Sequence, residues 1–198
     1  MADDLNRLEQ LLKARGILRV SELPKLGFPK TYLGELERRG RAVRQVRGIY
    51  CHPEVEIPKD FSLALACSRV SEGVICLLSA LAYHEIGTQS PHEVWIAIGP
   101  KARVPKLEYP ILRIARFSGD NLSEGVIETG DPFGIKVFSP AKTVADCFKF
   151  RNKIGLDVAL EALREGWRDK RFSIEELDHH AKICRVDKIM TPYLEAIL

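Results

Sequence analysis

The sequence predicts an α+β protein in which an N-terminal winged helix-turn-helix precedes a larger C-terminal α/β domain, with a mixed sheet, accompanying helices and a helical C-terminus. Three observations lead to this prediction. Residues 1–53 show helical patterns joined by a short turn and followed by a small β-ribbon. Residues 60–198 mix short apolar runs with helical patterns. Between them, residues 54–59 contain Pro58 and are typical of a linker.

A first helix is predicted from leucines at helical spacing. Its inner face consists of Leu5, Leu8, Leu11 and Leu12. Asp3 or Asp4 can cap its start, and Gly16 ends it. This helix would supply the third apolar face that the core of a helix-turn-helix needs. Residues 17–20 then form either a short strand or an extended link.

The next helix is predicted to begin at Ser21, whose hydroxyl can accept a hydrogen bond from an early backbone N–H group. Leu23 and Leu26 then face the same way. Gly27 permits the left-handed residue with which many helices end.

A second helix is predicted over residues 29–39. Pro29 suits its first position, where a backbone N–H would have no partner. At about 100° per residue, the side chains divide into two arcs. The apolar arc consists of Tyr32, Leu33 and Leu36. The opposite arc consists of Lys30, Thr31, Gly34 and Arg38. This second arc can lie in a DNA major groove, with its N-terminal residues nearest the bases.

A small β-ribbon is predicted after Gly40, with strands over residues 41–46 and 49–51 around the turn at Arg47 and Gly48. Its cationic side chains are Arg41, Arg44 and Arg47. They can hold phosphates or enter a minor groove. A run of arginines also fits an ordinary solvated face, and that alternative stays open.

The distribution of charge favours a nucleic-acid partner for this module. Residues 1–52 hold 11 Lys and Arg against 6 Asp and Glu, a net charge of +5. The remaining residues hold 19 against 21, a net charge of −2. The positive excess therefore lies on the N-terminal module, as binding to a phosphate backbone requires.

The second domain is predicted to begin near residue 60 with a helix over residues 61–70. Residues 74–85 fit either a strand followed by a helix from Ser79, or one buried helix, because periodicity cannot separate the two. The run EVWIAI at 93–98 is apolar on both faces, which is typical of a central strand. Further short strands are predicted at 111–117, 125–129 and 134–138, the last after a turn at 131–134.

The remaining chain is predicted to be helical. Ser139 followed by a proline starts one helix, and an apolar stripe marks the next at Leu156, Leu160, Leu163 and Trp167. Ser173 and Glu176 form a capping box, with Phe172 and Leu177 as a hydrophobic staple. A last helix spans about residues 186–197.

The cysteines are odd in number, widely spaced and mostly set among apolar residues: Cys51, Cys67, Cys76, Cys147 and Cys184. This predicts reduced, mostly buried thiols in a cytoplasmic protein rather than a disulfide framework or a zinc site. The N-terminus is polar and acidic, unlike a signal peptide. No apolar run approaches the ~18 residues that a membrane helix needs.

No catalytic residue, metal or cofactor is predicted, because each candidate pattern has a structural alternative. The spacing of His84, Glu85 and His92 is not that of a zinc helix, so a structural histidine is expected. Ser139 and Lys142 match a Ser-x-x-Lys pattern, but a serine before proline more often caps a helix. Lys142 and Asp146 are expected to form a surface pair or to brace a neighbouring helix.

The chain resembles the AbiEi family, the antitoxins of type IV toxin–antitoxin and abortive-infection loci. The resemblance rests on three segments. They are GFPKTYLGELERRGRAVRQVRGIY; LLSALAYHEIG with the following EVWIAI; and FSPAKTVADCFKFRNKIGLDVALEALREG, which resembles the family's SPAKT-x-x-D helix and the helix after it.

The resemblance implies a repressor that binds inverted repeats of double-stranded DNA in its own promoter. It also implies a C-terminal domain that counters a nucleotidyltransferase-like toxin without forming a stable complex with it. The resemblance and the helix pattern together predict a set of DNA-contacting residues. These are Lys25, Lys30, Thr31, Tyr32, Arg38, Arg39, Arg41, Arg44 and Arg47. Tyr32 and Arg39 lie near the apolar arc.

Two alternative functions remain open from the sequence. The basic module can deliver nucleic acid to an enzyme that processes it, although no family residue indicates catalysis. The C-terminal helices can instead form an interaction module that binds the toxin directly.

Overall fold

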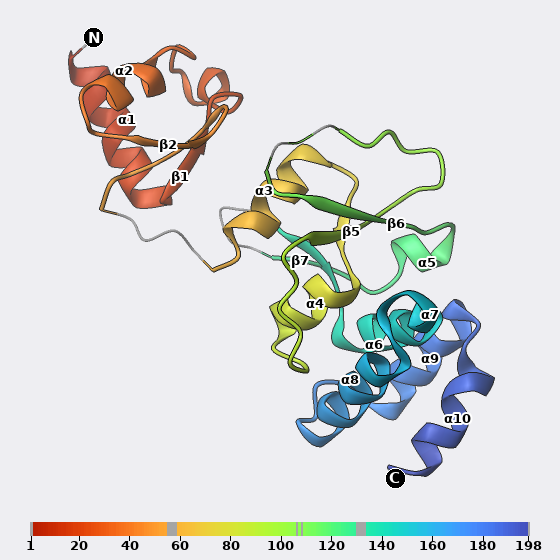
Figure 1. Ribbon diagram of the computed structural model, residues 1–198. Helices are drawn as coiled ribbons and strands as arrows, with labels where there is room; N and C mark the ends of the chain where they lie inside the picture. Colours follow the sequence, from red (N-terminus) through yellow and green to blue (C-terminus); the bar gives the residue numbers. More distant parts are fainter. Residues whose placement is uncertain (1, 55–58, 106, 108, 130–133, 198) are drawn as a thin grey trace. The chain divides into compact units, whose positions relative to one another are not determined.

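The structure is a computed structural model that describes residues 2–54, 59–105, 107, 109–129 and 134–197. Within these residues it is a mixed α+β structure with two sheets. The chain divides into two compact units, Met1–Lys59 and Asp60–Leu198 (Figure 1). They are called the N-terminal and C-terminal units below. Of the predicted linker at 54–59, residues 55–58 lie outside the described residues.

The N-terminal unit combines helices with an antiparallel sheet. Its elements are α1 (Ala2–Arg15), β1 (Ile17–Arg19), the 3-10 helix η1 (Leu23–Leu26), α2 (Tyr32–Arg38), β2 (Val43–Val46) and β3 (Ile49–Cys51). The strands lie in the order β1-β3-β2. Residues 17–20, for which the sequence left two possibilities, therefore include a strand.

Leucines from two helices form the core of this unit. Leu5, Leu8 and Leu12 of α1 pack in one cluster with Leu33 and Leu36 of α2, and none of these side chains is more than 1% exposed. The burial confirms the inner face predicted for each helix. It also determines which arc of α2 faces outward.

Two predicted helix starts are wrong. Ser21 caps no helix, because η1 begins after Glu22, whose carboxylate accepts a hydrogen bond from the Arg19 backbone N–H at 3.2 Å. The second helix begins at Tyr32 instead of Pro29, because the Pro29 carbonyl closes a turn onto the Tyr32 N–H at 3.1 Å.

The β-ribbon is confirmed but begins later than predicted. Its first strand starts at Val43 rather than at Arg41, whose side chain bonds to α1 as described below. Gly48 has a φ of 85° in the turn between β2 and β3, a conformation that favours glycine. The pairing register shifts between Arg44 and Val46.

The C-terminal unit contains a mixed sheet with strands in the order β6-β5-β4-β8-β7. The β5/β6 and β4/β8 pairs are parallel, whereas β4/β5 and β7/β8 are antiparallel. The strands are β4 (Val74–Ile75), β5 (Val94–Ile98), β6 (Leu112–Arg116), β7 (Val126–Glu128) and β8 (Lys136–Phe138). The helices are α3 (Phe61–Arg69), α4 (Leu77–His84), α5 (Asp120–Ser123), α6 (Pro140–Lys149), α7 (Arg151–Ile154), α8 (Leu156–Arg168), α9 (Ile174–Cys184) and α10 (Asp187–Glu195).

Helices cover both faces of this sheet. Leu63 and Ala66 of α3 pack in one apolar cluster with Ile96 of β5. Helices α6, α8 and α9 contribute to a second cluster, which includes Ala97 and Phe138 from the strands. Figure 1 shows α6, α8, α9 and α10 gathered together beside the sheet.

The alternatives for residues 74–85 are now decided. A short strand, β4, precedes helix α4, which begins at Leu77 rather than at Ser79. As predicted for EVWIAI, β5 is an interior strand, between β6 and β4. The one-turn helix α5 was not predicted, since four residues carry no periodic pattern. Of the predicted turn at 131–134, residues 131–133 lie outside the described residues.

Serine caps start two of the C-terminal helices, as predicted. Ser139 Oγ accepts a hydrogen bond from the Lys142 backbone N–H at 3.3 Å, at the start of α6. At the start of α9, the Glu176 backbone N–H donates to Ser173 Oγ at 3.2 Å, and the Ser173 N–H donates to the Glu176 carboxylate at 2.8 Å. Phe172, from the predicted staple, is also buried.

Replacing Ser173 by alanine is expected to lower the free energy of unfolding by about 1 kcal/mol, because the Glu176 backbone N–H loses the Oγ atom that accepts its hydrogen bond. Urea denaturation of the full chain measures the change. Ser71→Ala, at an exposed turn position, is the control. An equal loss in the two variants would contradict a specific capping role.

All of the cysteines are free and buried, as predicted. Among the described helices, none combines the length and apolar character that a membrane span requires.

Candidate nucleic-acid interface

The outward arc of α2 is cationic and exposed. Lys30 and Thr31 are exposed in the turn that leads into the helix, and the Arg38 side chain is 75% exposed. A Cβ atom placed on Gly34 would meet nothing within 4 Å, so the core does not require a glycine there. The predicted cationic surface is therefore exposed, but of its four residues only Gly34 and Arg38 lie on α2, and Lys30 and Thr31 precede it. Another molecule has room to approach the helix backbone closely at Gly34.

A carboxylate on the same helix forms ion pairs with two arginines. Glu35 pairs with Arg38 at 2.5 Å and with Arg39 at 2.8 Å. The hydrogen bond from Arg39 is the largest cause of a lowered pKa at Glu35. Both arginines remain accessible, but an incoming phosphate would compete with Glu35 for them.

Two further predicted residues occupy different environments. Lys25 is exposed on η1. Tyr32 is half-buried and packs against the leucine core, which indicates that its ring supports the fold more than it faces a ligand.

The ribbon presents two more arginines. Arg44 lies exposed on β2, and Arg47 is exposed in the turn to β3. Between them, Gln45 donates a hydrogen bond to Cys51 Sγ at 2.8 Å and so links the two strands at the register shift. These two arginines remain the candidates for contact with phosphates on the ribbon.

Arg41 is not on the ribbon, contrary to the sequence prediction. Its guanidinium donates to Asn6 Oδ1 at 2.8 Å and forms an ion pair with Glu9, both on α1. The hydrogen bond from Arg41 is the largest cause of a lowered pKa at Glu9. Arg41 thus ties the approach to β2 to the first helix, a structural role that the sequence spacing did not indicate.

The Ser-x-x-Lys pattern turns out to be part of a buried network. Lys142 Nζ lies 2.6 and 2.5 Å from the two carboxylate oxygens of Asp146, and both side chains are 0% exposed. The expectation of a surface pair is therefore wrong. Cys184 of α9 donates to Asp146 at 3.2 Å, which fits the alternative of a brace between helices. Burial raises the pKa of Asp146, and the adjacent ammonium opposes that rise.

The histidine considered as a metal ligand has a structural partner. His84 Nε2 lies 2.7 Å from the Phe138 carbonyl oxygen, which joins α4 to β8. Burial lowers the pKa of His84, so the neutral ring is favoured. This agrees with the structural histidine expected from the sequence.

Comparisons with known proteins bear on the fold. No protein-family model matches the chain, and no curated protein matches it. Among solved structures, the chain is similar to the crystal structure of RV2827C protein from Mycobacterium tuberculosis, with a TM-score of 0.58 and 15% sequence identity. The match covers 90% of this chain and 69% of that one. At this identity the likeness shows a shared fold alone.

Proposed function

We propose that the chain is a DNA-binding transcriptional repressor whose N-terminal unit is a winged helix-turn-helix. The observation that carries the proposal is the exposed cationic surface at α2. Lys30 and Thr31 of the preceding turn and Arg38 of the helix are exposed, whereas the leucines of the helix are buried. In this proposal α2 enters the major groove, and Arg44 and Arg47 on the ribbon contact phosphates.

The order of the elements supports the winged-helix assignment. A helix, a strand, two further helical segments and a two-stranded ribbon follow one another, and β1 pairs with β3 to close the sheet. The net charge of +5 on residues 1–52 also supports a nucleic-acid partner.

The proposal extends to an antitoxin of the AbiEi type, acting in the cytoplasm without catalysis of its own. Its support is the resemblance of the three sequence segments. The most specific of them contains Lys142 and Asp146, which are buried within the core. Those two residues therefore support a common C-terminal fold, and they do not mark the surface that would counter a toxin.

Binding to duplex DNA tests the repressor proposal. The full chain is titrated by fluorescence anisotropy against the promoter region of its own gene and against an unrelated duplex. We expect tighter binding to the promoter region than to the unrelated duplex. For both duplexes the affinity should fall steeply between about 50 and 200 mM salt, because binding displaces counterions from the DNA. Absence of binding at about 50 mM salt would exclude the proposal.

Co-purification tests the antitoxin proposal separately. The chain is co-expressed with the nucleotidyltransferase-like protein encoded beside it, if one is present. Rescue of growth without a stable complex is the expected result. A stoichiometric complex would favour a direct interaction module instead.

A further inference from the structure

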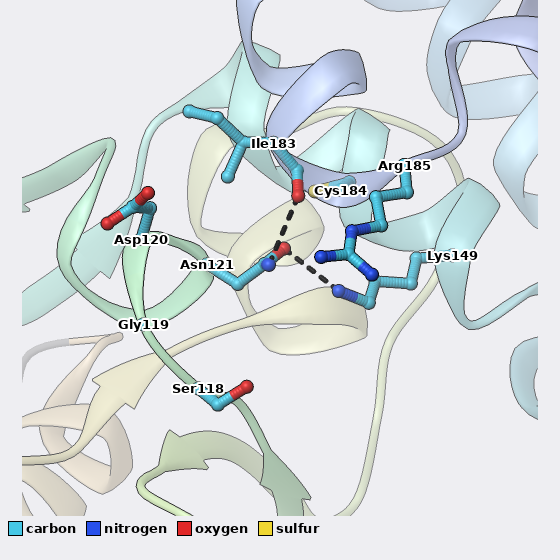
Figure 2. A pocket seen from close by; sticks show the side chains of 8 residues that line it. All are labelled: Ser118, Gly119, Asp120, Asn121, Lys149, Ile183, Cys184 and Arg185. Carbon is cyan, nitrogen blue, oxygen red and sulfur yellow. Dashed lines mark hydrogen bonds between the residues drawn. The ribbon is translucent and has the colours of Figure 1, made fainter.

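A surface pocket of the C-terminal unit lies where α5 and the ends of α6 and α9 meet (Figure 2). Its volume is about 630 Å³, within the range of roughly 300–1,000 Å³ that is usual for small-molecule sites. The lining is mainly polar and contains no aromatic side chain. Neither the DNA-binding proposal nor the antitoxin proposal uses this pocket.

Two cationic side chains from different helices converge in it. Lys149 is the last residue of α6, and Arg185 directly follows α9. Figure 2 shows the ammonium and the guanidinium on the same side of Asn121. Each lies at a helix C-terminus, where a cation interacts favourably with the free carbonyl groups. That interaction explains a cation at each helix end, but it does not explain their convergence.

A neutral amide lies beside the two cations and bonds to one of them. Lys149 Nζ donates to Asn121 Oδ1 at 2.9 Å, and Asn121 Nδ2 donates to the Ile183 carbonyl oxygen at 3.1 Å. The amide is therefore held in one orientation by both of its ends. Lys149 thus hydrogen-bonds to an amide instead of a carboxylate. The nearby buried carboxylate, that of Asp146, is already paired with Lys142.

Arg185 is exposed at the C-terminal end of α9. Its φ is 59°, in the left-handed region that favours glycine. Its guanidinium forms no hydrogen bond or ion pair with any residue that the structure describes. The carboxylate in the lining belongs to Asp120, which Figure 2 shows directed away from both cations.

We propose that this pocket binds the phosphate group of a small phosphorylated molecule. Arg185 and Lys149 would donate charge-assisted hydrogen bonds to the phosphate oxygens, with Asn121 holding Lys149 in place. Because no aromatic ring lines the pocket, it has no surface on which a nucleobase can stack. The site is therefore expected to recognise the phosphate group and not the base of a nucleotide.

The test is a titration of the ¹⁵N-labelled full chain, followed by NMR at constant ionic strength. The probes are pyrophosphate, ribose 5-phosphate and guanosine 5′-monophosphate, with chloride as the blank. We expect saturable shifts of the Asn121 side-chain amide and of backbone amides at 118–121 and 183–185. The two ribose phosphates should bind equally.

Matched variants decide whether the pocket is responsible. Arg185→Gly removes one cation and relieves the positive φ, so the fold should be retained while affinity falls about tenfold or more. Lys149→Gln removes the other cation and should weaken binding similarly. Lys170→Gly is the control, because Lys170 is also exposed with a positive φ of 53° but lies outside the pocket.

Three results would overturn the proposal. The first is the absence of saturable shifts with any of the phosphate probes. The second is an equal loss of affinity in Arg185→Gly and Lys170→Gly, which would indicate a general charge effect. The third is much tighter binding of the nucleotide than of ribose 5-phosphate, which would require a base site that the lining does not provide.

Discussion

Replacing Asp146 by alanine is expected to lower the free energy of unfolding of the C-terminal unit by about 3–5 kcal/mol. The change leaves the Lys142 ammonium buried without a counter-charge, beside the rings of Phe117 and Phe138. Domains are typically stable by only about 5–15 kcal/mol, so the loss is a large share of the total. Urea unfolding monitored by tryptophan fluorescence measures it, because Trp95 and Trp167 both lie in this unit.

The double variant Lys142→Met, Asp146→Leu is expected to recover most of that stability. Removing both charges abolishes the need to desolvate an ion pair, and apolar side chains of similar size can pack against the same aromatic rings. If the double variant is as unstable as Asp146→Ala, the ion pair contributes something that apolar packing cannot replace.

The control is an ion pair with the same spacing in the sequence. Asp178 and Lys182 of α9 are also four residues apart and lie 2.6 Å from each other, but their side chains are 51% and 66% exposed. Asp178→Ala is expected to have little effect, since exposed pairs contribute little. Equal effects of Asp146→Ala and Asp178→Ala would show that burial is not the cause.

These two pairs also show where prediction from the sequence reaches its limit. Spacing of four residues places two charges on one side of a helix but does not say whether that side is covered. In α6 every residue from Ala141 to Phe148 is buried, because the helix contacts α4, α8 and α9. Such burial depends on segments distant in the sequence, and no periodic pattern within α6 reports it.

Local signals predicted other features well. The leucine spacing of α1 and α2 correctly assigned their inner faces, and Ser139 and Ser173 marked helix starts through bonds to residues three positions later. The pairing of Arg41 with Glu9 joins residues 32 positions apart and therefore left no local signal. The candidate DNA surface could be predicted where it depends on helix periodicity. The prediction failed at Arg41, because a tertiary contact determines the position of that side chain.

Replacing both Arg44 and Arg47 by alanine is expected to weaken DNA binding strongly and about equally for all sequences. Both side chains are exposed on the ribbon, where phosphate contacts are proposed. Each lost phosphate contact should reduce the slope of log affinity against log salt by about 0.9, so the double variant should lose almost two. Anisotropy titrations over a range of salt concentrations measure both the affinity and the slope.

Arg38→Ala should behave differently, because Arg38 lies on the helix proposed to face the bases. Its loss is expected to weaken promoter binding by roughly 5- to 150-fold and to weaken binding to an unrelated duplex much less. The matched control for the ribbon variant is Lys13→Ala, Arg15→Ala, which removes the same charge from the end of α1. An equal drop in slope for this control would mean that the net charge of the unit, and not the ribbon, governs binding. A promoter preference that survives Arg38→Ala unchanged would show that Arg38 does not read the bases.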